Sequence, residues 1–128
     1  MLNANYGDLI YSDHKLYKHF GIYINENCVI HYDGKLDDKF FHEMCIRKTN
    51  MDRFLAGNNY YKIYKFKECK FSPDEVVKRA NSRIGEENFN LISNNCEHFG
   101  YWCKTGVHKS NQINTLIFIL IFLILILR

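Results

Sequence analysis

With 128 residues, the chain is long enough for one compact domain and too short for two. Its formal net charge of +3 is mild, and without a basic run or zinc-finger spacing the sequence gives little support to nucleic-acid binding. Its five cysteines are odd in number and follow no disulfide framework, and no signal-peptide pattern precedes them, so we expect free thiols in a reducing compartment.

The first part of the chain has the pattern of β-strands. A short strand is predicted at residues 7–11, followed by a hairpin whose strands are residues 19–24 and 28–32, with a three-residue turn between them. Successive residues of a strand point to opposite faces of a sheet. Because the two strands of a hairpin pair, His19 and His31 can share one site if the register brings them together.

The middle of the chain predicts further strands and a first helix. Residues 40–48 fit either a strand or a helix, and we favour a strand toward Cys45. Residues 60–66 alternate aromatic or aliphatic residues with lysines, which indicates a half-buried strand. Ser72 can cap a helix that has proline at its first position, and Gly85 is expected to close that helix.

A second helix is predicted from Cys96 to about Lys104, with an asparagine cap before it and Gly106 after it. Strands therefore come first along the chain and helices follow. This order predicts an α+β class, with a small antiparallel sheet packed against helices.

The helix start at Cys96 makes this cysteine a candidate nucleophile. Unpaired N–H groups and the positive end of the helix dipole stabilise a thiolate, which is the reactive form, and the same groups can hold an oxyanion. A nearby imidazole can take the thiol proton while a second polar group orients that imidazole, and His19 and His31 are candidates for these roles. Taken alone, each of the three residues also fits an ordinary buried cysteine or a hydrogen-bonded strand histidine.

The other polar side chains near these residues give weaker signals. A zinc site from Cys96, His98, Cys103 and His108 lacks a Cys-x-x-Cys pair, so no metal and no cofactor is expected. His98 lies about 200° around the helix from Cys96 and is interpreted as structural. Tyr17 would share a strand face with His19 and help at the oxyanion. Three further histidines have no evident partner in the sequence and are expected at the surface: His14, His42 and His108.

Four blocks of sequence, in this order, resemble the lecithin:retinol acyltransferase family. The blocks are Gly7-Asp8-Leu9-Ile10, the segment 17–23 around His19, the segment 29–32 around His31, and Asn95-Cys96-Glu97-His98-Phe99. The closer likeness is to the small phospholipase/acyltransferase branch, the HRAS-like suppressors. The resemblance spans residues 6–106.

This resemblance implies a circularly permuted papain-like fold, in which the histidine strands precede the cysteine helix. It implies Cys96 as nucleophile, His19 as general base and acid, and His31 as the residue that orients His19. Members of the family cleave phospholipid acyl esters or pass the acyl group to an acceptor. The expected activity is therefore that of a phospholipase A1/A2 or acyltransferase that forms a Cys96 thioester, with a phospholipid as donor and water, an amine or a lysolipid as acceptor.

The C-terminal segment, residues 111–128, contains twelve consecutive apolar residues at 116–127 and is separate from the predicted catalytic domain, residues 1–110. As a helix it would be about 18 to 23 Å long, against about 30 Å of bilayer hydrocarbon. A core helix apolar on all sides would need more covering helices than this domain supplies. We therefore expect a hydrophobic helix that acts as a single-pass membrane anchor, with the catalytic domain in the cytosol.

Two alternatives remain open at this level. The same permuted papain-like site would also suit cleavage of an isopeptide bond, as in small desumoylating or deubiquitinating proteases. The second alternative is a membrane-anchored interaction protein that keeps the fold but has no catalytic activity. In that case Cys96→Ala would leave the biological effect intact.

Overall fold

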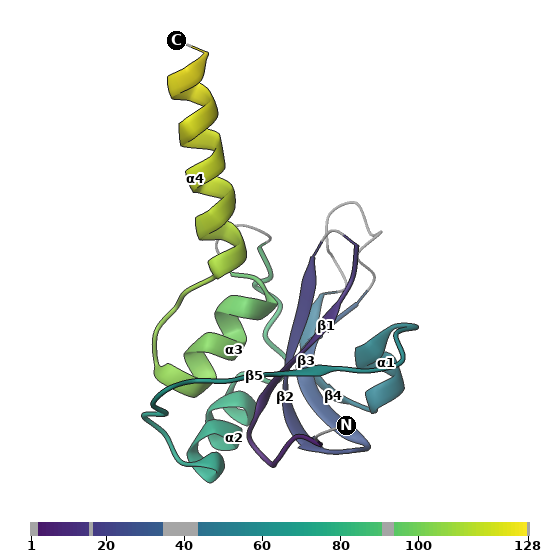
Figure 1. The fold of residues 1–128 in the computed structure, drawn as a ribbon. Helices are drawn as coiled ribbons and strands as arrows, with labels where there is room; N and C mark the ends of the chain where they lie inside the picture. Colours follow the sequence, from purple (N-terminus) through teal and green to yellow (C-terminus); the bar gives the residue numbers. More distant parts are fainter. Residues whose placement is uncertain (1–2, 16, 35–43, 91–93, 128) are drawn as a thin grey trace.

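A five-stranded antiparallel sheet forms the centre of the domain (Figure 1). The computed structural model describes residues 3–15, 17–34, 44–90 and 94–127. In sheet order the strands are β4 (Cys45–Thr49), β3 (Cys28–Asp33), β2 (Lys18–Asn25), β1 (Leu9–Asp13) and β5 (Lys62–Tyr64). The helices are α1 (Met51–Leu55), α2 (Pro73–Ser82), α3 (Cys96–Thr105) and α4 (Asn111–Ile126). The predicted α+β class is confirmed.

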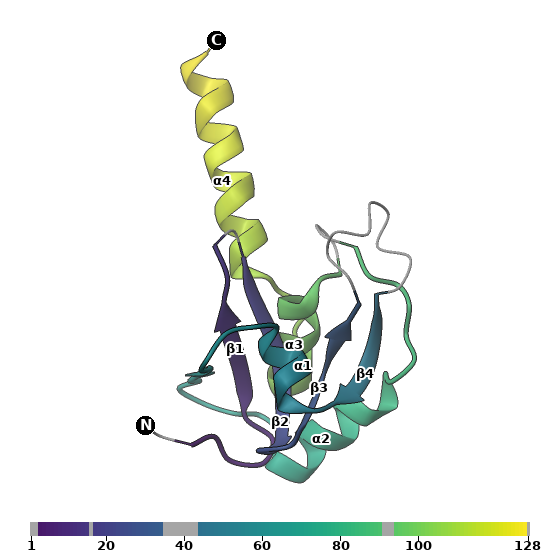
Figure 2. The same ribbon diagram turned by 90° about the vertical axis from the view of Figure 1, so that its right-hand side faces the viewer.

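Helices cover both faces of the sheet (Figure 2). On one face, α2 and α3 pack against strand residues such as Phe20 and Ile30, and this side holds the larger hydrophobic core. On the other face, Phe54 of α1 is fully buried in a smaller cluster. Because neighbouring strand residues alternate between faces, Phe20 faces α3 while His19 contacts Phe54.

The predicted hairpin is confirmed, and its register places the histidines. β2 and β3 pair with Gly21 opposite His31, and Asn25 pairs with Cys28, so the turn is one residue shorter than expected. A Cβ atom on Gly21 would lie 2.7 Å from a methyl carbon of Val29 and 2.8 Å from the ring of Phe54. Glycine at this position therefore lets α1 pack close to the histidine strands.

Other boundaries differ from the sequence prediction by a few residues. Ser72 accepts a hydrogen bond from the Glu75 N–H at 3.2 Å and caps α2 as predicted, but α2 ends at Ser82, before Gly85. β5 is shorter than the predicted strand at 60–66. β4 confirms a strand from Cys45 onward, whereas the earlier part of that prediction, including His42, lies outside the described residues.

The short helix α1 was not predicted. Its start is capped by Asn50, whose side chain accepts from the Arg53 N–H at 2.8 Å, and it ends at Ala56 in the left-handed conformation, with φ of 47°. A helix of five residues has too few turns for a hydrophobic period to show in the sequence. α1 matters because it brings Arg53 and Phe54 against the histidines.

The apolar C-terminal segment forms α4, which projects away from the domain (Figures 1 and 2). Its side chains from Leu116 to Leu127 are 45–81% exposed. Within the described ranges, none of the helices combines the length and the apolar character that crossing a membrane requires. The single-pass segment expected from the sequence is therefore not supported.

Candidate active site

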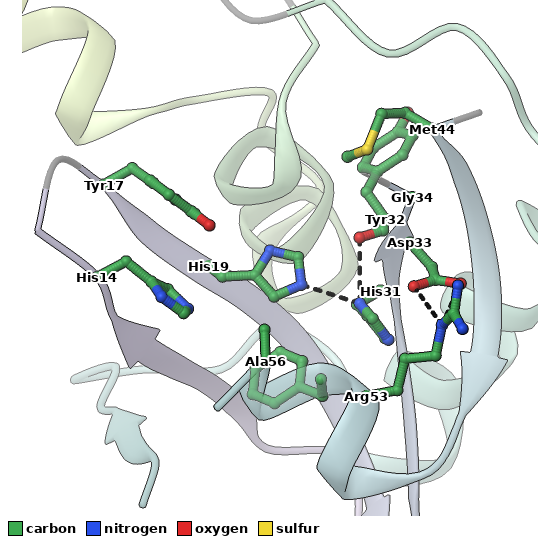
Figure 3. Close-up of a pocket in the computed structure, with 11 residues that line it drawn as sticks. His14, Tyr17, His19, His31, Tyr32, Asp33, Gly34, Met44, Arg53 and Ala56 are labelled. Atoms are coloured by element: carbon green, nitrogen blue, oxygen red, sulfur yellow. Dashed lines mark hydrogen bonds and ion pairs between the residues drawn. The ribbon is translucent and has the colours of Figure 1, made fainter. Parts of the chain in front are cut away.

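The two strand histidines meet on the face of the sheet that α1 covers (Figure 3). His19 Nε2 lies 2.9 Å from His31 Nδ1. The Phe54 ring packs against both imidazoles, with ring centroids 5.1 and 5.3 Å away. The structure therefore brings together the two histidines that the sequence suggested could share one site, with the Phe54 ring packed against both.

Thr49, at the end of β4, contacts the second nitrogen of His31. His31 Nε2 lies 2.7 Å from Thr49 Oγ1, and this hydroxyl donates to the Asn50 carbonyl at 3.1 Å. Because the Thr49 proton is already used, its oxygen accepts a hydrogen bond from His31 Nε2–H. His31 Nδ1 is then an acceptor for a proton on His19 Nε2, which leaves His19 Nδ1 as the basic nitrogen.

The carbonyl of Tyr32 opposes this arrangement. It lies 3.1 Å from His31 Nδ1 and favours a proton on that nitrogen. A neutral imidazole carries only one of the two protons, so Thr49 and the Tyr32 carbonyl favour different tautomers of His31. Sequence patterns did not identify Thr49, because its proximity to His31 depends on how β4 pairs with β3.

A carboxylate and two guanidinium groups lie beyond His31. Asp33 is nearly buried and accepts from Arg53 Nε at 2.9 Å and from Arg47 at 3.3 Å. Burial raises the pKa of Asp33, but the Arg53 hydrogen bond, His31 and Arg47 lower it by more, so its net pKa is below the ordinary value. Asp33 is therefore charged at neutral pH and is paired mainly with the arginines.

Burial keeps both histidines neutral. Burial, reinforced by the neighbouring His31, lowers the pKa of His19 to about 3. Burial likewise lowers the pKa of His31 to about 4, against an opposing effect of Asp33. At neutral pH the pair therefore has the uncharged form that a general base needs.

These lowered pKa values predict a loss of stability in acid. The unfolded chain binds protons at histidine near pH 6.5 and the folded chain does not, so the free energy of unfolding is highest above this pH and falls as the pH drops toward 4. We expect a loss on the order of 2 to 5 kcal/mol between pH 7 and pH 4.5. Urea unfolding at both pH values measures it, with His19→Gln as the comparison. An equally steep loss in that variant would contradict the assignment to His19.

Cys96 is the first residue of α3, and the helix start around it is fully capped. The Asn95 side chain accepts from the N–H groups of Glu97 and His98, at 2.9 and 3.1 Å. The His98 ring in turn accepts from the Asn95 N–H at 3.1 Å. His98 thus completes a capping box, which agrees with the structural interpretation of this residue.

The Cys96 thiol is buried against the strand that carries His19. The side chain is 8% exposed, and Sγ donates to the Lys18 carbonyl at 3.6 Å. Burial raises the pKa of Cys96 to about 11, although the backbone N–H groups of Phe20, Glu97 and Cys96 itself lower it. The helix start therefore does not by itself produce a thiolate, contrary to the sequence-based expectation, because desolvation is the larger effect.

A pocket opens beside the histidines, lined by residues of β2, β3 and α1 and of the segments next to the strands and α1 (Figure 3). His14 lines it and stacks on Tyr17 with ring centroids 4.9 Å apart, so the expected position of His14 at the surface without a partner is wrong. Tyr17 also lines the pocket, and its pKa is raised by burial and by the nearby Cys96. The position of Tyr17 is thus compatible with the suggested role at an oxyanion.

Cys96, His98 and His108 are not among the residues that line this pocket. His108 stacks on His98 with ring centroids 4.3 Å apart, so it also has a partner that the sequence did not indicate. All five cysteines are free. Among the residues that the structure describes, no group of three or more histidine, cysteine, aspartate or glutamate side chains is placed to hold a metal ion.

Comparison with known proteins assigns the chain to a family. The family model for lecithin retinol acyltransferase matches residues 3–109, which include both histidine strands and the cysteine helix. The chain is 29% identical over 129 residues to Phospholipase A and acyltransferase 3 of Homo sapiens, covering 87% of this chain and 76% of that protein. It is 30% identical over 125 residues to Phospholipase A and acyltransferase 1 of Rattus norvegicus, covering 88% and 74%.

Phospholipase A and acyltransferase 2 of Homo sapiens is 28% identical over 120 residues, which cover 84% of this chain and 74% of that protein. The match to the family model extends across all four sequence blocks from which the resemblance was inferred. The inferred resemblance is confirmed, and the chain belongs to the lecithin retinol acyltransferase family.

Proposed function

We propose that this protein is a cysteine-dependent phospholipase A1/A2 or acyltransferase that acts on glycerophospholipid acyl esters. The family and the names of its relatives support phospholipase and acyltransferase chemistry in general. The observation that carries the thiol mechanism is the arrangement along β2. His19 contacts His31 at 2.9 Å, while the residue before His19 accepts the Cys96 thiol hydrogen bond.

In the proposed first step, His19 Nδ1 takes the thiol proton and Cys96 Sγ attacks the ester carbonyl carbon. The Cys96 backbone N–H and the Tyr17 hydroxyl hold the developing oxyanion. The carbon–oxygen bond then breaks, and the departing lysophospholipid alkoxide takes the proton from His19. The product of this step is a Cys96 acyl thioester.

In the second step, water, an amine or a lysolipid hydroxyl attacks the thioester carbonyl. His19 takes a proton from this acceptor, the carbon–sulfur bond breaks, and the proton returns to the Cys96 sulfur. His31 accepts a hydrogen bond from His19 Nε2 throughout and so orients the base. The histidine strands precede the cysteine helix in the chain, which is the order of the circularly permuted papain-like fold that we propose.

The test of this function is incubation of the full chain with a defined phosphatidylcholine. Mass spectrometry should detect free fatty acid, lysophosphatidylcholine and an added acyl mass on the peptide that contains Cys96. Folded protein that gives neither a lysolipid nor an acyl adduct would rule the function out. Cleavage of isopeptide-linked substrates instead would favour the protease alternative.

Thr49 gives a sharper prediction about the histidine pair. Thr49→Val removes the acceptor that holds the proton on His31 Nε2, so the Tyr32 carbonyl draws the proton to Nδ1. His19 Nε2 must then act as an acceptor, and Nδ1 carries the proton and cannot take one from the thiol. We expect about a tenfold fall in kcat, equal to about 1.4 kcal/mol. Thr49→Ser, which keeps the hydroxyl, should stay close to wild type in steady-state assays.

We also propose that α4 associates the enzyme with a membrane, with the catalytic domain on the cytosolic side. A contiguous exposed apolar surface of this size is typical of a membrane or protein contact. Replacing Ile121, which is 53% exposed, by Asp should weaken co-sedimentation with phosphatidylcholine vesicles at least about threefold. The matched substitution Thr115→Asp, before the apolar run, should have a smaller effect. Equal sedimentation of Ile121→Asp and wild type would contradict the proposal.

A further inference from the structure

A buried carboxylate links the start of α4 to the start of α3. Glu97, which is 2% exposed, directs Oε1 toward the first turn of α4. This oxygen accepts from the Ser110 hydroxyl at 2.7 Å, from the Gln112 N–H at 3.0 Å and from Gln112 Nε2 at 3.3 Å. A buried charge with three donors fixes the position of its partners, because breaking the contacts would leave the charge unsatisfied. Glu97 therefore holds the Gln112 side chain in place.

The Gln112 amide in turn binds the main chain of Lys18. The Lys18 N–H donates to Gln112 Oε1 at 2.9 Å, and Gln112 Nε2 approaches the Lys18 carbonyl at 3.5 Å. The side-chain amide thus contacts both polar groups of one strand residue, as the peptide group of a neighbouring strand would. Pairing between β2 and β3 begins at Gly21, so Lys18 lies before the paired part of β2.

Cys96 contacts β2 between the residue that binds Gln112 and the residue at which pairing with β3 begins. Its thiol donates to the same Lys18 carbonyl, and the backbone N–H of Phe20 also acts on its sulfur. When the thiol loses its proton, the Lys18 carbonyl loses a donor and faces a negative sulfur. Gln112 Nε2 remains as a donor to that carbonyl and reduces the repulsion. The amide therefore acts on the reactive form of the nucleophile.

We propose that Gln112, held by Glu97, is a positioning residue that couples α4 to the Cys96 thiol through the main chain of Lys18. This inference rests on the proposed role of Cys96 as nucleophile. It gives the exposed apolar helix a second role, since any contact that reorients the first turn of α4 also moves the strand end next to His19. The side chain of Gln112 binds Lys18 and Glu97, so its effect on the sulfur is indirect.

The test compares two substitutions in the first turn of α4. Gln112→Met keeps the length of the side chain and removes both polar atoms. Asn111→Leu also removes a hydrogen bond between α4 and the domain, but this bond joins Asn111 Nδ2 to the Tyr64 hydroxyl on β5, at 3.0 Å. The readout is the rate at which N-ethylmaleimide alkylates Cys96 in the full chain, measured across pH by peptide mass spectrometry.

Gln112→Met should slow alkylation at neutral pH about tenfold and move its midpoint to higher pH, whereas Asn111→Leu should follow wild type. In lipid assays, Gln112→Met should lower kcat and leave KM nearly unchanged. An unchanged rate and midpoint in Gln112→Met would overturn the proposal, and so would equal slowing in Asn111→Leu. If Gln112→Met does not fold, Gln112→Asn, whose amide is too short to reach Lys18, is judged by the same criteria.

Alkylation of Cys96 needs no lipid, so the two proposals can fail separately. Wild-type protein that releases no lysolipid would refute the proposed function, while the comparison of alkylation rates would still decide the role of Gln112. If wild-type protein is active on lipid and the Gln112 variants are alkylated like wild type, only the proposed coupling between α4 and Cys96 would be refuted.

Discussion

Cys96→Ser is expected to abolish lysophospholipid release and acyl-enzyme formation, with a loss of at least about 10³-fold in kcat. The substitution replaces one atom in a capped helix start, so the fold should be retained. A hydroxyl is far harder to deprotonate than a thiol. Transfer of the proton to His19 is therefore much less favourable from a serine hydroxyl than from the cysteine thiol. Mass spectrometry of the intact protein and of released lipids provides both readouts.

Cys69→Ser is the matched control, because Cys69 is an exposed free cysteine outside the site. Its activity should equal that of wild type. If the Cys96→Ser protein still formed lysolipid at a wild-type rate, the thiol mechanism would be wrong. The non-catalytic alternative predicts a different result. In that case the wild-type protein would turn over no lipid, and the Cys96→Ser protein would keep the biological effect of wild type.

His19→Gln is expected to lower kcat about 10²- to 10⁴-fold, the range for loss of a general base. Glutamine keeps a polar side chain beside His31 but cannot carry a proton between thiol and substrate. His108→Gln is the control, because His108 is exposed, stacks on the capping residue His98 and does not line the pocket. Activity of His19→Gln within threefold of the control would exclude His19 as the base.

The pH profile of wild type adds a separate check on His19. Since burial lowers the pKa of His19 to about 3 from its ordinary value of 6.5, the base stays deprotonated throughout the mildly acidic range. The acid limb of kcat/KM should therefore lie well below pH 6.5. An inflection at the ordinary value would mean that the base is solvated, or that another histidine carries the proton.

Several elements could be predicted because their signals are local. The hairpin of β2 and β3 follows from strand alternation around a short polar turn, and the observed register then brings His19 and His31 together. The start of α2 at Pro73 follows from the cap at Ser72. The start of α3 at Cys96 likewise follows from an asparagine cap before an apolar helix.

Other features were not predicted correctly, because their sequence signals are short or depend on residues far away in the chain. The five-residue helix α1 leaves too little pattern to detect, and with it the contacts of Phe54 and Arg53 were missed. His14 was expected at the surface, but packing on Tyr17 places it at the pocket. The apolar run at the C-terminus was correctly located as a helix, whereas its expected span across a bilayer was not supported.

The sequence by itself thus predicted the candidate nucleophile and the two candidate histidines, and it determined the family, since each prediction depends on residues close together in the chain or on their order. Only the tertiary structure decided the chemical state of these groups. Desolvation of Cys96 and His19 depends on atoms from several elements, and it outweighs the effect of the helix start on the thiol. Thr49 and Gln112 reach the site through strand pairing and helix docking, and Gln112 meets Lys18 across 94 residues of chain. No local pattern encodes contacts of that kind, because they form only when the sheet, α3 and α4 come together.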